Sequence, residues 1–426
     1  MDTEHQVVII GGGFAGLNAA KTLKHAQVKI TLIDRRNFHL FQPLLYQVAT
    51  GDLSAANIAS PLRTILRKQK NVHVVMDEVT GFDVADKKVL LKGGEVGYDS
   101  LIVAAGGDHN YYGNDRWQPY APGLKYLEDA FDIRNRIFSA FENAENEKDS
   151  EKQKQWMSFV IVGGGSTGME LAGSLAEIAT DTIRSEYNSI DPSGWKITLV
   201  EGIDRLIPQY PISLSNRARK ELERKGIRVL TGAMVSEIDD NGVTLKIGEN
   251  SEFIPSKTVI WAAGVKASPL GKALSDAAGC ELDRGGRVIV DSRLNVPGHP
   301  DIFVVGDLAH VKNGNGNSLP GLAPVAIQEG DYAANSILKA LRGKTVEPFK
   351  YLNRGMMSIV GRGSAVAVLR GHEYSGTFAW LLWLFVHLMY IVQFGNRLLI
   401  MTQWAWEYFS RNHHARLLTE KRECLG

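Results

Sequence analysis

The sequence predicts an α/β chain built from two Rossmann-like dinucleotide-binding domains and a C-terminal helical region. Two glycine turns of the form G-x-G-x-x-G, at residues 11–16 and 163–168, each lie between an apolar strand and a helix. Each turn is followed by a second apolar strand that ends on an acid, Asp34 in one case and Glu201 in the other. The length of 426 residues agrees with this division, because a single core stops growing at about 250 to 300 residues.

Charge and cysteine content exclude several classes of protein. Basic and acidic residues nearly balance, at 48 against 47, so we expect no nucleic-acid partner. Cys280 and Cys424 are the only cysteines in the sequence, so we expect neither a disulfide framework nor a metal site. The first strand starts near the N-terminus without the pattern of a signal peptide, and we therefore expect the body of the protein in the cytoplasm.

The first turn follows an apolar strand at residues 7–10. Gly11 permits a tight bend, Gly13 lets the backbone approach a pyrophosphate, and Gly16 lets the next helix pack closely on the strand. That helix, at about residues 15–24, directs its positive N-terminus at the phosphates. Asp34 can accept hydrogen bonds from the ribose of an adenosine. The alternative is a glycine-rich turn that binds nothing.

The rest of the first half-domain ends near Trp117. Residues 37–51 are aromatic and broken by Pro43, so they pack either against a flat ligand or into the core. Residues 72–83 and 87–91 are predicted strands. Residues 98–107 form a buried strand that ends in small residues, which allow a cofactor to come close.

The second turn repeats this arrangement after a predicted helix at residues 127–155, whose charged end reads as a solvated helix or linker. The strand at residues 159–162 precedes the turn, and the strand at 197–200 ends on Glu201. Two complete fingerprints imply two separate dinucleotides. A chain that holds two is most simply a flavoprotein that passes a hydride from a nicotinamide to a flavin.

Glu201 predicts which nicotinamide nucleotide is preferred. Its carboxylate would bind the free 2′-hydroxyl of NADH and repel the 2′-phosphate of NADPH. Arg205 lies close in the sequence and could partly relieve that repulsion.

After the second turn, further strands are predicted at residues 227–230, 243–247 and 258–263, with Gly264 at the end of the last. The strand at 301–305 presents Asp307 beside Gly306, where the carboxylate either caps a helix or bonds the ribityl chain of a flavin. We predict a first flavin-binding segment, a nicotinamide-binding domain, a second flavin-binding segment and a membrane-associating region, at residues 1–117, 118–285, 286–345 and 346–426.

These motifs together resemble the glutathione-reductase-like flavoproteins that bind two dinucleotides. Within that group, the chain resembles the type II (alternative, non-proton-pumping) NADH:quinone oxidoreductases of respiratory electron transport over nearly its whole length. The more specific matches are residues 41–45 with Ala49 and Gly51, residues 163–170, and residues 323–330. The family usually has Ala-Gln-x-Ala-x-Gln in the last segment. Pro324 stands here at the first glutamine, and Gln328 keeps the second.

The resemblance implies FAD at the first turn, NADH at the second, and a membrane quinone near Gln328. Glu170 matches the family's glutamate close to nicotinamide and flavin, and we expect Glu170 and Gln328 to be the catalytic pair, as positioning or proton-path residues. From the residues alone, Glu170 could instead be a first-turn acid that complements a helix dipole. The residues expected to bind FAD are Gly11, Gly13, Phe14, Ala15, Gly16, Asp34, Arg35, Gln42, Val79, Ala105, Gly106, Gly306, Asp307, Ala323 and Pro324. Those expected to bind NADH are Gly163, Gly165, Ser166, Thr167, Gly168, Glu201 and Gly264.

A predicted helix at residues 323–341 has its proline near the first turn, where the missing N–H costs nothing. Its positive N-terminus could face the flavin and stabilise the anionic reduced ring without a charged side chain.

The lack of a cysteine pair and the character of the C-terminal region limit which class of electron acceptor the chain can use. Disulfide reductases and sulfide:quinone oxidoreductases need cysteine pairs, which two distant cysteines do not supply. Residues 378–394 carry no formal charge, and a second apolar stretch at 398–409 contains two tryptophans and is flanked by Arg397 and Arg411. The tryptophans and arginines favour a pair of helices in the lipid interface over a membrane span or a buried core or dimer surface.

We therefore expect a peripheral or monotopic enzyme on the cytoplasmic face of the cell membrane, and a homodimer is left open. Two rival classes remain. One is a soluble NADH-dependent reductase of a small redox protein, and the other is a signalling flavoprotein that uses NADH binding as a switch.

Overall fold

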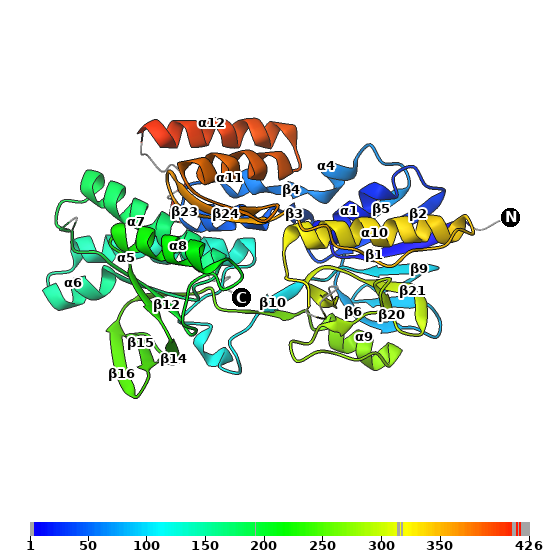
Figure 1. Ribbon diagram of the computed structural model, residues 1–426, viewed down its shortest axis with the longest axis horizontal. Coiled ribbons are helices and arrows are strands. Elements are labelled where there is room, and N and C mark those ends of the chain that lie inside the picture. Colours follow the sequence, from blue (N-terminus) through cyan, green and yellow to red (C-terminus); the bar gives the residue numbers. More distant parts are fainter. Residues whose placement is uncertain are drawn as a thin grey trace. The chain divides into compact units, whose positions relative to one another are not determined.

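The computed structural model describes residues 4–191, 193–312, 316, 318–410, 415 and 417–418 (Figure 1). It divides into two compact units that each draw on separate parts of the sequence. Unit 1 comprises residues 1–40, 59–108 and 265–353, and unit 2 comprises residues 41–58, 109–264 and 354–426. Cys280 is a free buried thiol in unit 1, and the predictions for Cys424 and Arg411 lie outside the described residues.

Unit 1 is organised around a six-stranded sheet. Its strand order is β20-β21-β9-β1-β2-β5, and β21, β9, β1, β2 and β5 all run parallel. The strands are β1 (His5–Ile10), β2 (Val28–Asp34), β5 (Val72–Met76), β9 (Ser100–Val103), β20 (Asn295–Val296) and β21 (His299–Val304). The five parallel strands end at the same edge, so the turns after β1, β9 and β21 are neighbours there.

Two helices of unit 1 pack side by side beside this sheet (Figure 1), namely α1 (Phe14–Thr22) and α10 (Ala323–Leu341). Gly330 permits their close approach, because a Cβ at this position would lie 2.1 Å from the carbonyl oxygen of Ala15. The helix expected at residues 323–341 is confirmed with both ends in place.

The smaller elements of unit 1 correct one predicted strand. Residues 72–83 form two strands, because β5 joins the large sheet while β6 (Val79–Asp83) pairs with β7 (Lys88–Leu91). β8 (Gly94–Gly97) completes that sheet, and α9 (Leu270–Ala278) packs on β6. The remaining short elements are β3 (Phe38–Leu40), β4 (Ala59–Pro61), α4 (Leu62–Leu66), β18 (Val265–Ala267), β19 (Val288–Ile289), η3 (Gly306–Leu308) and β22 (Ala309–His310).

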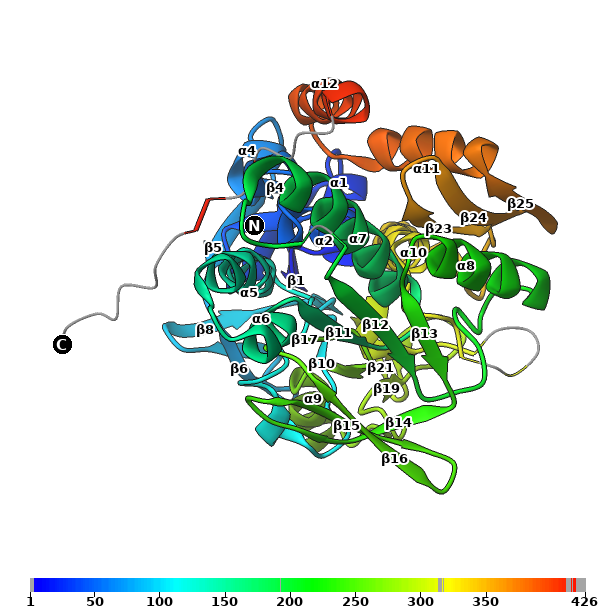
Figure 2. The same ribbon diagram turned by 90° about the vertical axis from the view of Figure 1, so that its left-hand side faces the viewer.

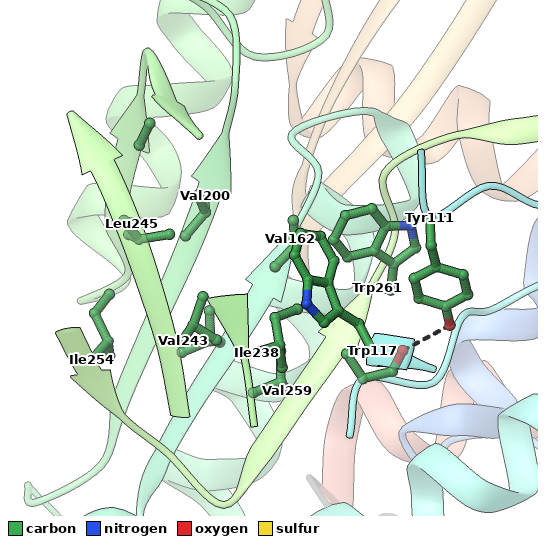
Figure 3. Packing of buried hydrophobic residues seen from close by; sticks show 13 residues of the cluster. Tyr111, Trp117, Val162, Val200, Ile238, Val243, Leu245, Ile254, Val259 and Trp261 are labelled. Carbon is green, nitrogen blue, oxygen red and sulfur yellow. Dashed lines mark hydrogen bonds between the residues drawn. The ribbon is translucent and has the colours of Figure 1, made fainter. Parts of the chain in front are cut away.

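Unit 2 contains a second parallel sheet with the strand order β13-β12-β11-β17. These strands are β11 (Ser158–Val162), β12 (Lys196–Glu201), β13 (Arg228–Thr231) and β17 (Thr258–Trp261). An antiparallel sheet packs beside it, made of β14 (Ala233–Ile238), β15 (Gly242–Ile247) and β16 (Asn250–Pro255). A hydrophobic core lies between the two sheets (Figure 3), and there the Tyr111 hydroxyl donates to the carbonyl of Ala121 at 2.8 Å.

The helices of unit 2 correct a second prediction. Residues 127–155 form two helices, α5 (Leu127–Asn146) and α6 (Ser150–Trp156), because Asp149 caps the second one by accepting from the backbone of Glu151 and Lys152. The other long helices are α7 (Ser166–Glu186) and α8 (Ile212–Arg224). The short elements are η1 (Gln42–Leu44), α2 (Leu45–Ala49), α3 (Ala55–Ile58) and η2 (Asp115–Trp117).

Residues 41–53 illustrate the packing alternative raised above. Leu44, Leu45, Tyr46, Val48 and Ala49 are all at most 4% exposed. They belong to α2 and its approach, and α2 packs against α5 and α7. The middle of this segment is therefore core of unit 2.

The C-terminal part of unit 2 forms a sheet and two helices (Figures 1 and 2). The sheet consists of β23 (Met356–Gly361), β24 (Ser364–Leu369) and β25 (His372–Gly376), and α11 (Thr377–Tyr390) packs on it. α12 (Phe394–Ser410) contacts α11 and α3. Within the described part of the chain, no helix combines the length and apolarity that a bilayer crossing requires.

Candidate functional site: two phosphate turns and a buried carboxyl edge

The first phosphate turn, in unit 1, has the geometry that its glycines predict. Gly11 has φ +100°, its N–H donates to Ile33 at 2.8 Å, and an added Cβ would lie 2.3 Å from the carbonyl oxygen of Ala104. A Cβ on Gly16 would lie 1.9 Å from the carbonyl oxygen of Gly11. A Cβ on Gly13, by contrast, would meet no atom within 4 Å, so the space before Gly13 suits a phosphate.

Asp34 closes this turn at the end of β2. Its Oδ2 accepts the N–H of Gly12 at 2.6 Å, and its Oδ1 accepts the N–H of Arg36 at 2.7 Å. Burial raises the pKa of Asp34, while these two hydrogen bonds oppose that rise. Each oxygen keeps a further lone pair, so the carboxylate can still accept from a ribose hydroxyl. Phe14 and Ala15 begin α1 directly after the turn, and Arg35 follows Asp34.

His39 is a residue of the same turn that sequence reasoning missed. Its ring is 2% exposed, its Nδ1 lies 2.9 Å from the carbonyl oxygen of Gly12, and it contacts Phe14 edge to face. Burial lowers its pKa to about 4, so the ring is neutral at pH 7. A neutral ring with Nδ1 protonated can donate to this carbonyl, which fixes the turn from its second side.

The turn after β21 lies at the same edge of the sheet, with β9 between it and the first turn. Gly306 has φ +75°, and its N–H donates to Oε2 of Glu329 on α10 at 2.6 Å. Val305, and not Asp307, takes the N-cap position of η3, so the helix-cap alternative for Asp307 is wrong. Across β9, two strand spacings separate this turn from the Gly11 turn by about 10 Å.

A cavity of about 320 Å³ opens at this turn and at the first turn of α10. Burial raises the pKa of Glu329 to about 8, which makes this carboxyl a proton donor near neutral pH. Glu329 is a second residue that sequence reasoning missed, because only the fold brings it to Gly306. Residues that line the cavity include Lys266, Arg287, Gly306, Asp307, Leu322 and Glu329.

The remaining predicted FAD residues are placed as follows. Ala105 and Gly106 follow β9, with Gly106 at φ +67°, and Val79 starts β6. Ala323 and Pro324 form the first turn of α10. Gln42 belongs to unit 2, where its Nε2 donates to the carbonyl of Lys125 at 3.0 Å.

Gln328 lies on α10, and its amide bonds Leu352 in both directions. Its Oε1 accepts the N–H of Leu352 at 2.9 Å, and its Nε2 donates to the Leu352 carbonyl at 3.1 Å. The side chain therefore clamps the segment after α10. Its role toward a quinone stays a prediction.

The second phosphate turn, in unit 2, repeats the first. Gly163 has φ +113°, and its N–H donates to Val200 at 2.7 Å. A Cβ on Gly168 would lie 1.8 Å from the carbonyl oxygen of Gly163, and Gly165 again faces open space. Ser166 and Thr167 begin α7. Gly264, after β17, has φ +102° and accepts from the N–H of Asn110 at 3.3 Å.

Glu201 takes the place of Asp34 in the second turn. Its Oε2 accepts the N–H of Gly164 at 2.6 Å, and its Oε1 accepts the N–H of Ile203 at 3.0 Å. Arg205 donates to the carbonyls of Tyr210 and Pro208, so its guanidinium bonds its own loop. Its predicted effect on NADPH stays a prediction.

Glu170 lies on α7, partly buried. Its Oε1 accepts the N–H of Ile359 at 3.3 Å, and burial raises its pKa to about 8. α7 has no acid in its first turn, so the reading of Glu170 as a first-turn acid that complements the helix dipole is wrong. A carboxyl with this pKa can hold or release a proton near neutral pH.

Comparisons with known proteins identify the family and the fold of this chain. The model of the pyridine nucleotide-disulphide oxidoreductase family matches residues 5–330. The chain is 43% identical to the type II NADH:quinone oxidoreductase Ndh of Mycobacterium tuberculosis, over 98% of this chain and 91% of that one. It is 29% identical to the type II NADH:quinone oxidoreductase of Staphylococcus haemolyticus, over 87% of this chain and 91% of that one.

A solved structure of NDH2 from Plasmodium falciparum in complex with NADH shares the fold. Its TM-score is 0.89 at 20% identity, covering 98% of this chain and 100% of that chain. The fold, with two Rossmann-like domains, is thereby shown. The chain therefore belongs to the type II NADH:quinone oxidoreductases, enzymes that use FAD and NADH, within the pyridine nucleotide-disulphide oxidoreductase family.

Proposed function

We propose that the Gly11 turn of unit 1 binds FAD, that the Gly163 turn of unit 2 binds NADH, and that α11 and α12 hold the enzyme at the membrane where it reduces a quinone. When bound, FAD accepts a hydride from NADH and passes two electrons to the quinone. The observation that carries this assignment is that each turn leaves its third glycine, Gly13 or Gly165, open and holds an acid behind the glycine before it.

The residues of unit 1 suit FAD because they form one continuous edge. The open Gly13 and the positive end of α1 would take the pyrophosphate. Asp34 would accept from the adenosine ribose, and Asp307 would bond the ribityl chain. The N-terminus of α10 supplies a positive helix end beside the cavity at Gly306, without a charged side chain in the first turn of the helix.

The residues of unit 2 suit NADH. Gly165 would receive the pyrophosphate, and Glu201 would accept from the adenosine ribose. Glu170 would hold a proton close to the nicotinamide, since its pKa lies near neutral pH. No side chain has to act as a nucleophile.

The flavin cycle tests this assignment directly. Purified protein should be yellow, NADH should bleach it, and a short-chain menaquinone or ubiquinone should restore the colour. Colourless protein that takes up no FAD would contradict the proposal. Faster recovery with rubredoxin or ferredoxin than with either quinone would favour the soluble-reductase alternative.

Membrane attachment is supported by the exposed apolar side chains on the outer surface of α11 and α12. Large apolar side chains there are between 37% and 84% exposed: Phe378, Leu381, Phe385, Met389, Tyr390, Phe394, Leu398, Leu399, Met401, Trp406, Tyr408 and Phe409. Exposed apolar patches of this kind mark interaction sites. A quinone is confined to the bilayer, so we assign this surface to lipid at the cytoplasmic face of the cell membrane.

Surface variants test the attachment without removing a helix. Replacing Phe378, Phe385 and Phe409 with serine should release the protein from liposomes while NADH still reduces the flavin. A matched control replaces three exposed apolar residues elsewhere in unit 2, Ile212, Met234 and Phe253, and should leave binding unchanged. If the first variant still floats with liposomes but the wild type forms dimers that the variant does not, the surface joins two copies instead.

A further inference from the structure

A stripe of polar side chains runs along one face of α7. Glu170, Ser174, Glu177 and Asp181 recur at intervals of four, three and four residues, which places them on the same side of a helix. Eleven residues at about 1.5 Å each give the stripe a length of about 16 Å. Ser174 is 7% exposed, whereas Glu170 is partly accessible, so the stripe leads from the interior of unit 2 to the acid of the proposed site.

At Ser174 the stripe meets the turn that follows α2. The Ser174 hydroxyl lies 2.9 Å from Oδ2 of Asp52 and 2.9 Å from Oγ1 of Thr50, and it can donate to either. The Thr50 hydroxyl in turn lies 3.0 Å from the same Asp52 oxygen. All three side chains are buried. Because a hydroxyl can both donate and accept, this cluster can pass a proton by exchanging hydrogen bonds.

A second buried acid, Glu407 of α12, lies beside this cluster. Its side chain is 8% exposed, and its Oε1 has no hydrogen-bond partner among the residues that the structure describes. Gln403, one turn earlier, donates from Nε2 to the Asp52 carbonyl at 2.6 Å, so α12 is bonded to the Asp52 turn. A buried carboxyl oxygen without a hydrogen-bond partner is costly when the group is ionised, and it indicates a group that holds or exchanges a proton.

Burial and the neighbouring polar and charged groups determine the pKa of Glu407. Burial and the negative charge of Asp52 raise its pKa to about 9, while Gln403 and the cation Arg362 oppose the rise. Arg362 also lies 3.6 Å from Asp181, and Lys225 pairs with Glu177 at 2.8 Å. These pairs balance the charges at the far end of the stripe. The raised pKa means that Glu407 holds a proton near neutral pH.

At the other end of the stripe, Glu170 interacts electrostatically with the hydroxyl of Tyr46. Among charged groups, Glu170 raises the pKa of the Tyr46 hydroxyl most, after the effect of burial. Gln47 donates to this hydroxyl at 3.0 Å and accepts from the indole of Trp404 at 2.9 Å. A hydrogen bond between α2 and α12 thus lies next to the Tyr46 hydroxyl.

We propose that Asp52, Glu407 and the hydroxyls of Thr50 and Ser174 form a proton relay that resupplies Glu170 during quinone reduction. This inference rests on the proposed function. Oxidation of NADH by a quinone, NADH + H⁺ + Q → NAD⁺ + QH₂, consumes one proton from solvent, and the relay carries that proton without moving electrons.

In each step one O–H bond breaks and one forms. The proton held by Glu407 passes through the Asp52 carboxylate to the Ser174 oxygen, and the proton of Ser174 leaves toward Glu170. Side chains one helical turn apart stand about 5–6 Å from each other at Cβ, so one water between them completes the transfer. Glu407 is then reprotonated from solvent.

The test separates the two halves of the reaction. In Ser174→Ala and Glu407→Gln, stopped-flow reduction of the flavin by NADH should stay within about twofold of the wild type. Reoxidation by a short-chain menaquinone should slow about 10- to 100-fold, at the lower end of general acid–base contributions. Its solvent deuterium isotope effect should rise, and Ser174→Thr should restore the rate. Glu223→Gln, an exposed Glu of α8 in the same unit, is the matched control and should match the wild type.

The pH profile gives a readout that a structural role would not move. Wild-type reoxidation should fall on the alkaline side as Glu407, whose pKa is raised to about 9, loses its proton, and this fall should be absent in Glu407→Gln. Wild-type rates, isotope effects and pH profiles in both variants would overturn the relay. If Glu407→Gln loses FAD or melts early, Ser174→Ala with its Thr rescue decides alone. A wild type that NADH bleaches but no quinone reoxidises would overturn the proposed function, and the relay with it.

Discussion

The two phosphate turns share one backbone design but are held differently on their second side. In each, the first glycine takes a positive φ and the acid of the second strand accepts the N–H of the middle glycine. The carbonyl of that middle glycine meets the His39 ring in unit 1, whereas in unit 2 it accepts the backbone N–H of Ile207 at 2.8 Å. On this side, the turn that we propose for FAD thus depends on a histidine side chain, whereas the turn that we propose for NADH is held by a backbone hydrogen bond.

The largest expected effect comes from the first glycine of each turn. Gly11→Ala would force a Cβ to 2.3 Å from the Ala104 carbonyl at φ +100°, and strain of this kind costs about 3 kcal/mol or more. The protein should purify without FAD, as absorbance at the flavin band would show.

Gly163→Ala should separate the two turns. A Cβ there would lie 2.6 Å from the carbonyl carbon of Ala262, yet the flavin turn is untouched. We expect normal FAD content with NADH-driven bleaching lost or strongly slowed. Gly13→Ala is the control for folding: its Cβ meets no protein atom, so with FAD removed from both proteins its melting temperature should equal that of the wild type. Loss of FAD from Gly163→Ala would break the assignment of one cofactor to each turn.

The acids give the next largest effect. Glu201→Gln removes the charge that repels a 2′-phosphate. Hydrogen bonds to charged groups are worth about 1.5–3 kcal/mol, so the ratio of kcat/KM for NADH over NADPH should fall about 10- to 100-fold. Asp34→Asn should leave this ratio alone and weaken FAD retention instead. An NADPH preference already present in the wild type would contradict the reading of Glu201.

The smallest expected effect near neutral pH comes from His39, because its contribution to stability changes only under acid conditions. A histidine holds this side of the turn in unit 1 alone, so His39 also distinguishes the two turns most clearly. Its folded pKa of about 4 lies below the usual 6.5, so the unfolded state binds the extra proton first. The stabilisation is present above pH 6.5 and is lost as the pH falls toward about 4, by up to about 3 kcal/mol.

FAD release on acidification measures this contrast. Wild-type protein should release FAD progressively below pH 6.5, whereas His39→Gln, which can still donate to Gly12, should lose that pH dependence. His73→Gln, an exposed histidine of the same unit, should behave like the wild type. Equal acid release from His39→Gln and the wild type would show that other groups control the flavin turn.

Local patterns predicted much of the fold because glycine turns and the strands beside them are determined by near neighbours. Gly11, Gly163, α10 and the start of α11 at Thr377 follow from spacing alone. The strand type at residues 72–83 and the helix type at 127–155 are confirmed, but the break within each was not predicted, because strand pairing and the Asp149 cap divide continuous patterns.

The missed residues share a different cause. Glu329 reaches Gly306 across 23 positions of the chain, and His39 reaches Gly12 across 27. No local pattern marks such partners, because a buried acid in a helix and a lone histidine look like ordinary residues until the fold places them. Glu407 was likewise read as part of an apolar stretch, although its carboxyl points inward.

α12 is therefore unsuitable as a removable anchor. Its outer side is apolar, but its inner side carries Gln403 and Trp404, which bond Asp52 and Gln47. Trimming the chain before α11 would strip those partners along with the lipid contact. A water-soluble version for crystallography or inhibitor screening should keep both helices whole and exchange only their outward-facing apolar residues for polar ones.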